Sequence, residues 1–319
     1  MNARFLGLVG ALSCAAYAQT GSIAGPTAGY VFDPSVKALR QIRGIPGAAT
    51  MGDAIFPFGM SMASAEISPR GDSAIVVAVD GSVHLFRLKD GGASEQTVDN
   101  LLTPAAKVVY SPSGTSAALV GSGSTQVVRG LPDAPAVAMT VSRPAPRVAM
   151  MIAGVQSRTV MLDAVAVSDD GELMLLAGER SVELISSAAG RKLADAQTSA
   201  VLAFAPGSHD AAVVSGGKLT VFRDLTGAGT TQDFPNAAAP AGLAFSADGS
   251  RVVMAGPRAA TVLDRATGAR QTVTYDFQPS RLSAMGSFFR LNEVGSGPLW
   301  LLDPAGEAKL VFIPARHGL

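Results

Sequence analysis

The stretch from Leu243 to Thr274, LAFSADGSRVVMAGPRAATVLDRATGARQTVT, decides the fold class. Short runs rich in Val, Leu, Ala and Thr alternate there with turns of Ser, Asp, Pro and Gly, the pattern of strands in tight hairpins. The first turn recurs along the chain, with its glycine at Gly71, Gly114, Gly171, Gly207, Gly249 and, in a more degraded unit, Gly286. A period near 40 residues built from four short strands is typical of a β-propeller blade. We therefore predict an all-β propeller with four-stranded antiparallel blades.

The number of blades follows from counting these units. Complete units are predicted at residues 61–100, 104–142, 161–197, 199–235, 240–277 and 279–315. The N-terminal segment 30–42 matches the third and fourth strands of the unit and has no recognisable first strand. Because the C-terminal unit is complete, we interpret this segment as part of a blade of its own, a partial first blade at 28–60. Seven blades are therefore expected, and a six-bladed ring with residues 28–43 as an outer layer is the alternative.

Two of the turns carry a family resemblance. The hairpin from Asp264 to Val273 and the turn from Phe245 to Gly249 resemble those of bacterial WD40-like and YVTN-type propellers. The resemblance covers residues 28–315. The Gly-His and Trp-Asp dipeptides of true WD40 blades are absent, since Leu301 follows the single tryptophan, Trp300. The resemblance rests on structural turns, so it implies the fold and no particular activity.

The first 18 residues read as a secretory signal peptide. One arginine precedes an uncharged apolar run from Phe5 to Ala16, and the small residues Ala16 and Ala18 stand before Gln19. We predict export to the periplasm or beyond the cell, with residues 19–319 as a single propeller domain. Lipid anchoring at Cys14, the only cysteine, is the alternative. No later segment reaches the length of a membrane-spanning helix.

The charge balance bears on partners. The chain has 25 basic and 25 acidic residues and no run of like charge, whereas nucleic-acid binders show a basic patch or stripe. We therefore expect no nucleic-acid partner. A monomer that binds an unidentified protein or envelope component is predicted.

An insertion of about 15 residues interrupts the repeat at 143–158. Such a connection, from an outer strand to the next inner strand, crosses the face of a propeller that commonly carries ligand sites. The segment is therefore a candidate interaction surface, formed by Arg143, Arg147, Met150, Met151 and Arg158. The interpretation that the sequence favours is an additional strand or a segment packed onto its neighbour. The other irregular region, 43–58, is expected to be a packed connector.

Clustered ligands for catalysis or metal binding are hard to find in the sequence. His84, His209 and His317 fall in a strand, a turn and the C-terminal tail, which predicts exposure to solvent or local hydrogen bonding. The strands expected to line the central channel offer Glu66 and Asp163, too few oxygen ligands for a calcium cage of the kind that propeller lactonases hold. We predict no catalytic, metal-binding or cofactor-binding residues and no cofactor.

Three functional hypotheses follow. The first is an exported, non-catalytic propeller that acts as a protein or ligand interaction module in the cell envelope. The alternative is a propeller enzyme with its site at the central channel, either a lactonase-like, calcium-dependent hydrolase or a lyase. A small-ligand sensor is a third possibility, and it requires an aromatic lining that 6% aromatic residues can hardly supply.

Overall fold

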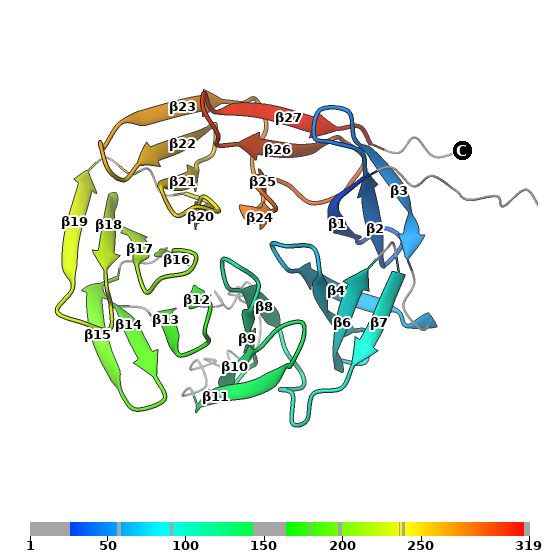
Figure 1. The fold of residues 1–319 in the computed structure, drawn as a ribbon, viewed down its shortest axis with the longest axis horizontal. Helices are drawn as coiled ribbons and strands as arrows, with labels where there is room; N and C mark the ends of the chain where they lie inside the picture. The colour runs from blue at the N-terminus through cyan, green and yellow to red at the C-terminus, as the bar shows by residue number, and fades with distance from the viewer. Residues whose placement is uncertain are drawn as a thin grey trace, which may run out of the picture.

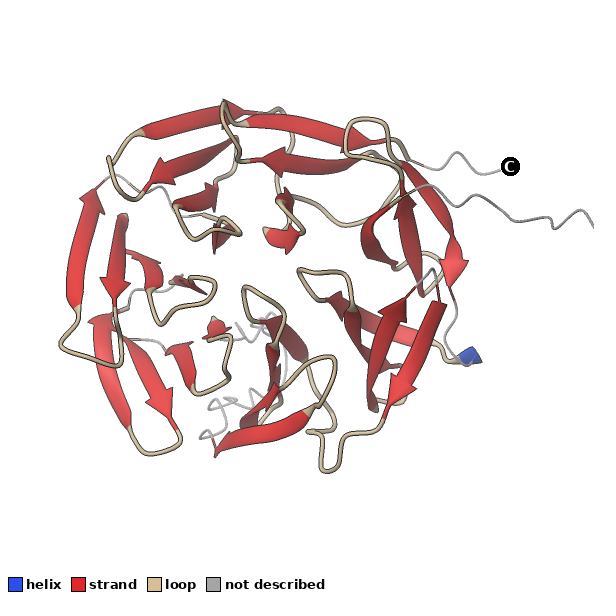
Figure 2. Cartoon of the chain, in the orientation of Figure 1, coloured by secondary structure: helices blue, strands red, loops and turns tan. Residues whose placement is uncertain are grey.

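The computed structural model describes residues 26–55, 59–89, 92–142, 164–178, 180–196, 200–235, 237 and 240–315. Within these residues, seven antiparallel sheets are arranged radially around a central axis (Figure 1). Strands joined by short loops account for nearly all of the ring (Figure 2). The predicted propeller and its seven blades are confirmed. The six-bladed alternative is wrong, because residues 27–55 form a sheet of their own.

Blades 2 to 7 each contain four strands in chain order, and the first strand of each is the innermost. Blade 2 comprises β4 (Met62–Ile67), β5 (Ser73–Ala78), β6 (Val83–Lys89) and β7 (Gly92–Gln96), and blade 3 comprises β8 (Lys107–Tyr110), β9 (Ser116–Val120), β10 (Ser124–Arg129) and β11 (Ala136–Ser142). Blade 4 comprises β12 (Val165–Val167), β13 (Leu173–Ala177), β14 (Ser181–Ser186) and β15 (Gly190–Asp195), and blade 5 comprises β16 (Val201–Phe204), β17 (Ala211–Ser215), β18 (Lys218–Arg223) and β19 (Thr230–Pro235). Blade 6 comprises β20 (Gly242–Phe245), β21 (Arg251–Ala255), β22 (Ala259–Asp264) and β23 (Arg270–Thr274), and blade 7 comprises β24 (Ser283–Met285), β25 (Phe288–Arg290), β26 (Leu299–Asp303) and β27 (Lys309–Ile313).

In blades 2, 3, 4 and 6 a serine hydroxyl holds the turn between the first and second strands. In blade 6 the hydroxyl of Ser246 accepts the backbone N–H of Arg251 at 2.9 Å and donates to Asp248 at 2.6 Å. Gly249 completes this turn with φ of 70°, a conformation that glycine adopts without steric cost. Ser168 accepts the N–H of Leu173 at 3.0 Å in the same way. The sequence pattern that recurs near every 40 residues is therefore a hydrogen-bonding requirement of the turn.

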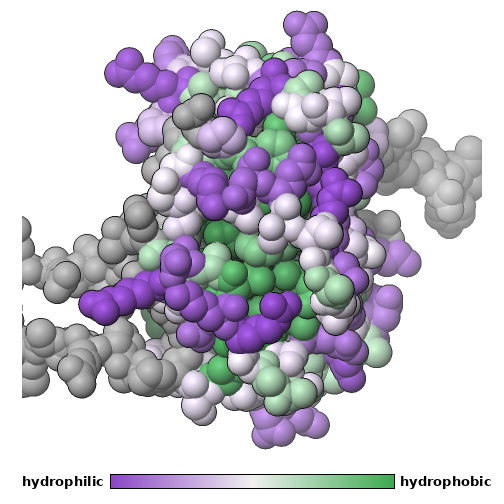
Figure 3. Space-filling view, turned by 90° about the vertical axis from the view of Figure 1, so that its left-hand side faces the viewer, coloured by the Kyte–Doolittle hydropathy of each residue, from purple (hydrophilic) through white to green (hydrophobic). Residues whose placement is uncertain are grey.

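The core lies between neighbouring blades. Leu219 and Val221 of blade 5, for example, pack with Val252 and Leu263 of blade 6 in one buried cluster. Outermost strands such as β15 and β19 are mostly exposed and polar. The side of the ring that carries them shows hydrophilic side chains over much of its surface, with apolar ones visible between (Figure 3). Burial between blades, with a polar rim, is what the alternation along each unit predicts.

Blade 1 differs from the other six blades. Its described strands are β1 (Thr27–Asp33), β2 (Ala38–Arg43) and β3 (Thr50–Ile55), in that order across the sheet. The start of β1 at Gly29 lies against Gly71, in the first-to-second turn of blade 2. In the complete blades, the second strand begins at the face of the ring that carries the first-to-second turns. The fourth strand leads from the outer edge of its blade to the next blade. By direction and order, β1, β2 and β3 therefore occupy the second, third and fourth positions.

Two predictions about this region need correction. The segment 30–42 was expected to supply third and fourth strands, but its strands take the second and third positions, because β3 pairs outside β2. The connector predicted at 43–58 contains that strand. The hairpin sequence of blade 1 resembles that of a third-to-fourth pair of strands. Only the pairing of β2 with β3 shows that the hairpin occupies the second and third positions instead. As predicted, the described part of blade 1 has no strand at the first position.

Candidate functional site

Blades 7 and 2 meet directly on the inner side of blade 1. The backbone N–H of Gly286, in the first-to-second turn of blade 7, donates to the carbonyl of Pro69, in the equivalent turn of blade 2, at 2.7 Å. The guanidinium of Arg281, just before β24, forms an ion pair with the carboxylate of Glu66 on β4. These contacts close the ring where the other blades place an inner strand.

A small cavity of about 60 Å³ lies in this gap. Its lining comes from three blades: Ala28, Gly29 and Tyr30; residues 66–71; and residues 283–286 with Arg290. A water needs roughly 10–15 Å³ of such volume, so the space suits a few waters or one group the size of a carboxylate. The cavity is therefore too small for a whole sugar or nucleotide.

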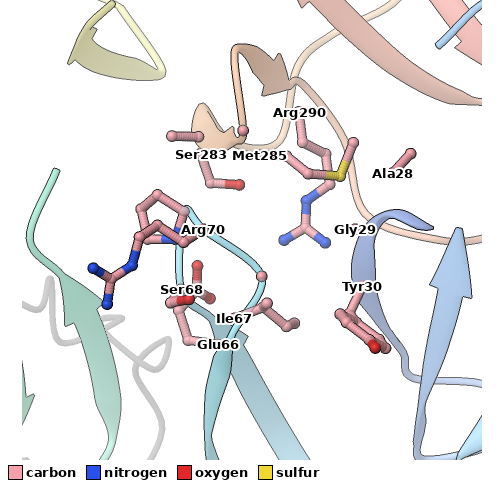
Figure 4. A pocket seen from close by; sticks show the side chains of 14 residues that line it. Ala28, Gly29, Tyr30, Glu66, Ile67, Ser68, Arg70, Ser283, Met285 and Arg290 are labelled. Atoms are coloured by element: carbon pink, nitrogen blue, oxygen red, sulfur yellow. The ribbon is translucent and has the colours of Figure 1, made fainter. Parts of the chain in front are cut away.

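Arg290, at the end of β25, is the notable side chain of this cavity. Its side chain is only 5% exposed, and the guanidinium points into the space between Gly29 and Ile67 (Figure 4). The buried Nε has no hydrogen-bond partner among the described residues, and the carboxylate of Glu293 lies 3.7 Å from Nη2. Burial, together with the nearby charge of Arg281, lowers the pKa of Arg290 to about 10, so the group is still a cation at neutral pH.

The carboxylate of Glu293 serves Arg281 more closely than Arg290. Its Oε1 accepts from Nη1 of Arg281 at 2.6 Å, so Arg281 bridges Glu66 and Glu293. Lys107 on β8 lies in the same electrostatic environment. Burial lowers the pKa of Lys107, and the charge of Glu66 partly offsets this effect. Three cations therefore face two carboxylates in this group, which leaves one positive charge without a counter-ion within it.

The arginines of this site were missed by the sequence analysis, although a signal existed. The second strands of blades 2 to 6 carry apolar or small residues after their first position: SAIVVA, SAALV, LMLLA, AAVVS and RVVMA. The corresponding strand of blade 7 reads FFR and ends in a buried arginine. A charged residue in the most buried strand of a repeat is the feature that marks the site.

The candidate interaction surface is not tested by the structure. Arg143, Arg147, Met150, Met151 and Arg158 lie outside the described residues, as do Asp163, His317 and the predicted signal peptide. Within the described ranges, no group of three or more His, Cys, Asp or Glu residues is placed to hold a metal ion. No helix in that part of the chain is long and apolar enough to span a bilayer.

His84 makes local hydrogen bonds within blade 2, as expected, whereas His209 contacts a residue of the neighbouring blade. His84 Nδ1 lies 2.6 Å from Glu95, and Nε2 lies 2.7 Å from the hydroxyl of Ser82, an arrangement that superficially matches a catalytic triad. The hydroxyl of Ser82 also lies 2.6 Å from Asp80 Oδ1, which accepts the backbone N–H of Ser82 as well. The serine therefore caps the turn between β5 and β6. His209 Nε2 lies 2.6 Å from Asp170.

Comparison with known proteins supports the fold. No protein-family model and no curated protein matches the sequence. The fold is similar to that of a functionally unknown protein from Desulfotomaculum acetoxidans, with a TM-score of 0.56 at 12% identity over 90% of this chain and 99% of the other. A "putative 6-phosphogluconolactonase" from Bacteroides fragilis gives a TM-score of 0.57 at 12% identity over 90% and 94%. Sqt1 from Saccharomyces cerevisiae gives 0.51 at 11% identity over 93% and 87%. These likenesses establish a shared propeller fold.

Proposed function

We propose that this chain is an exported, non-catalytic binding propeller of the cell envelope that recognises an anionic group in the cavity beside blade 1. The observation that carries the proposal is the buried guanidinium of Arg290, which points into that cavity and has an unpartnered Nε. Buried cations are normally paired, because an uncompensated charge in the interior is costly. A bound anion is the partner that would compensate this one.

The position of the cavity supports a binding role. Its lining joins blades 7, 1 and 2, so a ligand there contacts the seam at which the ring closes. The surplus positive charge of the group formed by Lys107, Arg281, Arg290, Glu66 and Glu293 favours an anion over a cation. A module that binds one charged group, while the rest of its partner lies outside, fits a cavity of this size.

The alternative function is the calcium-dependent, lactonase-like hydrolase considered from the sequence, and the Bacteroides neighbour is named as a "putative 6-phosphogluconolactonase". Of the channel carboxylates that this hypothesis would use, Glu66 is engaged by Arg281. A calcium ion would have to displace that guanidinium, so the observed pairing supports the anion-binding role instead.

Thermal denaturation of the mature chain from Gln19 tests the two functions together. Small anions would be titrated at constant ionic strength in sodium chloride, and Ca²⁺ or EDTA would be added in parallel samples. We expect at least one anion to raise the melting temperature saturably, because a ligand that binds only the folded state stabilises it. No response to any anion would overturn the proposal, and a rise with Ca²⁺ alone would favour the hydrolase.

Export is tested separately. We expect the protein recovered from a periplasmic or culture-medium fraction to begin at Gln19 when its N-terminus is sequenced. An intact leader on protein confined to the cytoplasm would contradict export, and a lipid-modified Cys14 would support the anchored alternative.

A further inference from the structure

We infer that the cavity beside blade 1 is a carboxylate site, in which Arg290 holds the carboxylate of a short-chain organic acid. This inference rests on the proposed anion-binding function and adds the chemical class of the ligand. It is carried by the shape of the donor, the size of the cavity and the charges around it.

The donor favours a planar anion. A guanidinium presents its N–H groups in a planar fork, and two parallel hydrogen bonds to the two oxygens of a carboxylate match that fork. The Nε of Arg290 has no partner, and the only ion pair of this side chain within the described residues is the 3.7 Å approach to Glu293. The fork therefore has donors to offer to a ligand.

The volume limits what can accompany the carboxylate. About 60 Å³ admits a carboxylate and little more than a methyl group, and the apolar atoms of Met285, Ile67 and Ala28 are available to contact that group. Longer or branched acids would have to displace the turns that Gly286 and Pro69 join by their backbone hydrogen bond. We therefore expect affinity to fall as the chain lengthens.

The charges around the cavity favour a ligand with one negative charge over a ligand with two. The charged residues beside the cavity, Lys107, Arg281, Arg290, Glu66 and Glu293, have a single surplus positive charge, and the carboxylate of Glu66 itself borders the cavity. A phosphate dianion would be repelled by Glu66 and would leave one charge uncompensated in a partly buried place. A monocarboxylate compensates Arg290 and leaves the Arg281 bridge intact.

Calorimetric titration and thermal denaturation with formate, acetate, butyrate, sulfate and phosphate test the inference on the mature chain at neutral pH and constant ionic strength. We expect formate or acetate to bind saturably, and sulfate and phosphate to bind at least about tenfold more weakly. Arg290→Met should abolish the response. Arg258→Met, at an exposed arginine in the turn between β21 and β22, is the matched control and should respond like the wild type.

Arg290→Lys provides a second test that keeps the charge. A lysine cannot form the planar fork, so the variant should lose about tenfold in acetate affinity and most of the preference for acetate over sulfate. It also covers the case in which Arg290→Met does not fold. In the wild type, acetate affinity should fall as the pH rises through about 10, the pKa of Arg290, where half of its guanidinium has lost the proton.

The outcomes separate the two proposals. Equal or tighter binding of sulfate or phosphate, lost in Arg290→Met, would leave the anion site standing and overturn the carboxylate assignment. Acetate binding that survives in both Arg290 variants would overturn the role of Arg290. Stabilisation by none of the anions would overturn both the inference and the proposed function.

Discussion

Blade 6 and blade 1 differ in what lies at the inner position of the blade, next to the central axis. Blade 6 fills its inner position with the strand β20, and its first turn is closed by Ser246 and Gly249. The described part of blade 1 has no inner strand, and the side chains of Glu66, Arg281 and Arg290 from the adjacent blades occupy that side. Where the repeat is complete, backbone hydrogen bonds and apolar side chains make a rigid scaffold. Where the described blade is incomplete, charged side chains and a cavity lie on the side that the inner strand occupies elsewhere.

The two arrangements differ in their chemical consequences. An inner strand satisfies its own backbone groups in the sheet and leaves little room for a ligand. Charged side chains in the same position are costly to bury unless each has a partner. The pairing of Arg281 with two carboxylates meets this requirement, and the environment of Arg290 meets it only in part. The proposed anion would complete the pairing of Arg290 beside blade 1.

The substitutions with the largest expected effect test whether the cores of blade 6 and blade 1 are equally well packed. Leu263 in blade 6 and Leu39 in blade 1 are both fully buried. Replacing either by alanine should lower the free energy of unfolding by about 2–5 kcal/mol, because each leaves a cavity in a packed interface. Chemical denaturation of the two variants measures this. A loss below about 1 kcal/mol for Leu39→Ala alone would show that blade 1 is loosely packed and would weaken the comparison.

A double-mutant cycle addresses the ion pair that closes the ring beside blade 1. The side chains of Glu66 and Arg281 are 22% and 21% exposed. We expect Glu66→Gln and Arg281→Met to show a coupling energy of about 1–3 kcal/mol in unfolding experiments, since the pair is partly desolvated.

The control for this cycle is an ion pair on the rim. Lys218 and Asp233 approach to 3.0 Å, and both side chains are more than half exposed, at 53% and 52%. Their coupling should stay below about 1 kcal/mol, because water and salt screen exposed charges. Equal coupling for the two pairs would contradict a special role for Arg281 in ring closure.

The serine of the repeated turn should have a smaller effect. Ser246→Ala removes the acceptor of the Arg251 backbone N–H and should lower the free energy of unfolding by about 1–2 kcal/mol. Ser250→Ala, one residue beyond the turn glycine, is the control, because its exposed hydroxyl contacts only Asp248. If both variants are equally stable, the serine is not what holds the turn.

The smallest predicted effect concerns the pH dependence of that turn. Hydrogen bonds from Ser246 and Ser250 lower the pKa of Asp248 to about 2. The unfolded chain therefore binds this proton more readily than the folded chain, so the stabilisation is present above about pH 4 and is lost as the pH falls towards 2. Asp248→Asn should be less stable than the wild type by under about 1 kcal/mol at pH 7, and this difference should shrink below pH 4. A difference that is constant from pH 7 to pH 2 would show that the charge of Asp248 is irrelevant.

The propeller and its complete blades were predictable because the information is local. The same turn recurs in blades 2, 3, 4 and 6, where Ser246 or its equivalent accepts a backbone N–H and a glycine has positive φ. The partial first blade was predicted too, but its strands were assigned to the wrong positions. The sequence 30–42 suits any tight hairpin, and only the pairing of β2 with β3 and the contact of Gly29 with Gly71 decide its place.

The sequence by itself determined the fold class and favoured seven blades over six. Hydrophobic alternation and turn chemistry act over a few residues, so they can be read directly from the chain. Only the tertiary structure decided that Glu66 and Arg281, separated by 215 residues, form an ion pair across the ring closure. It also decided that Arg290 is buried with its Nε unpartnered. Closure of a ring brings distant blades together, and no local pattern records which side chains then meet.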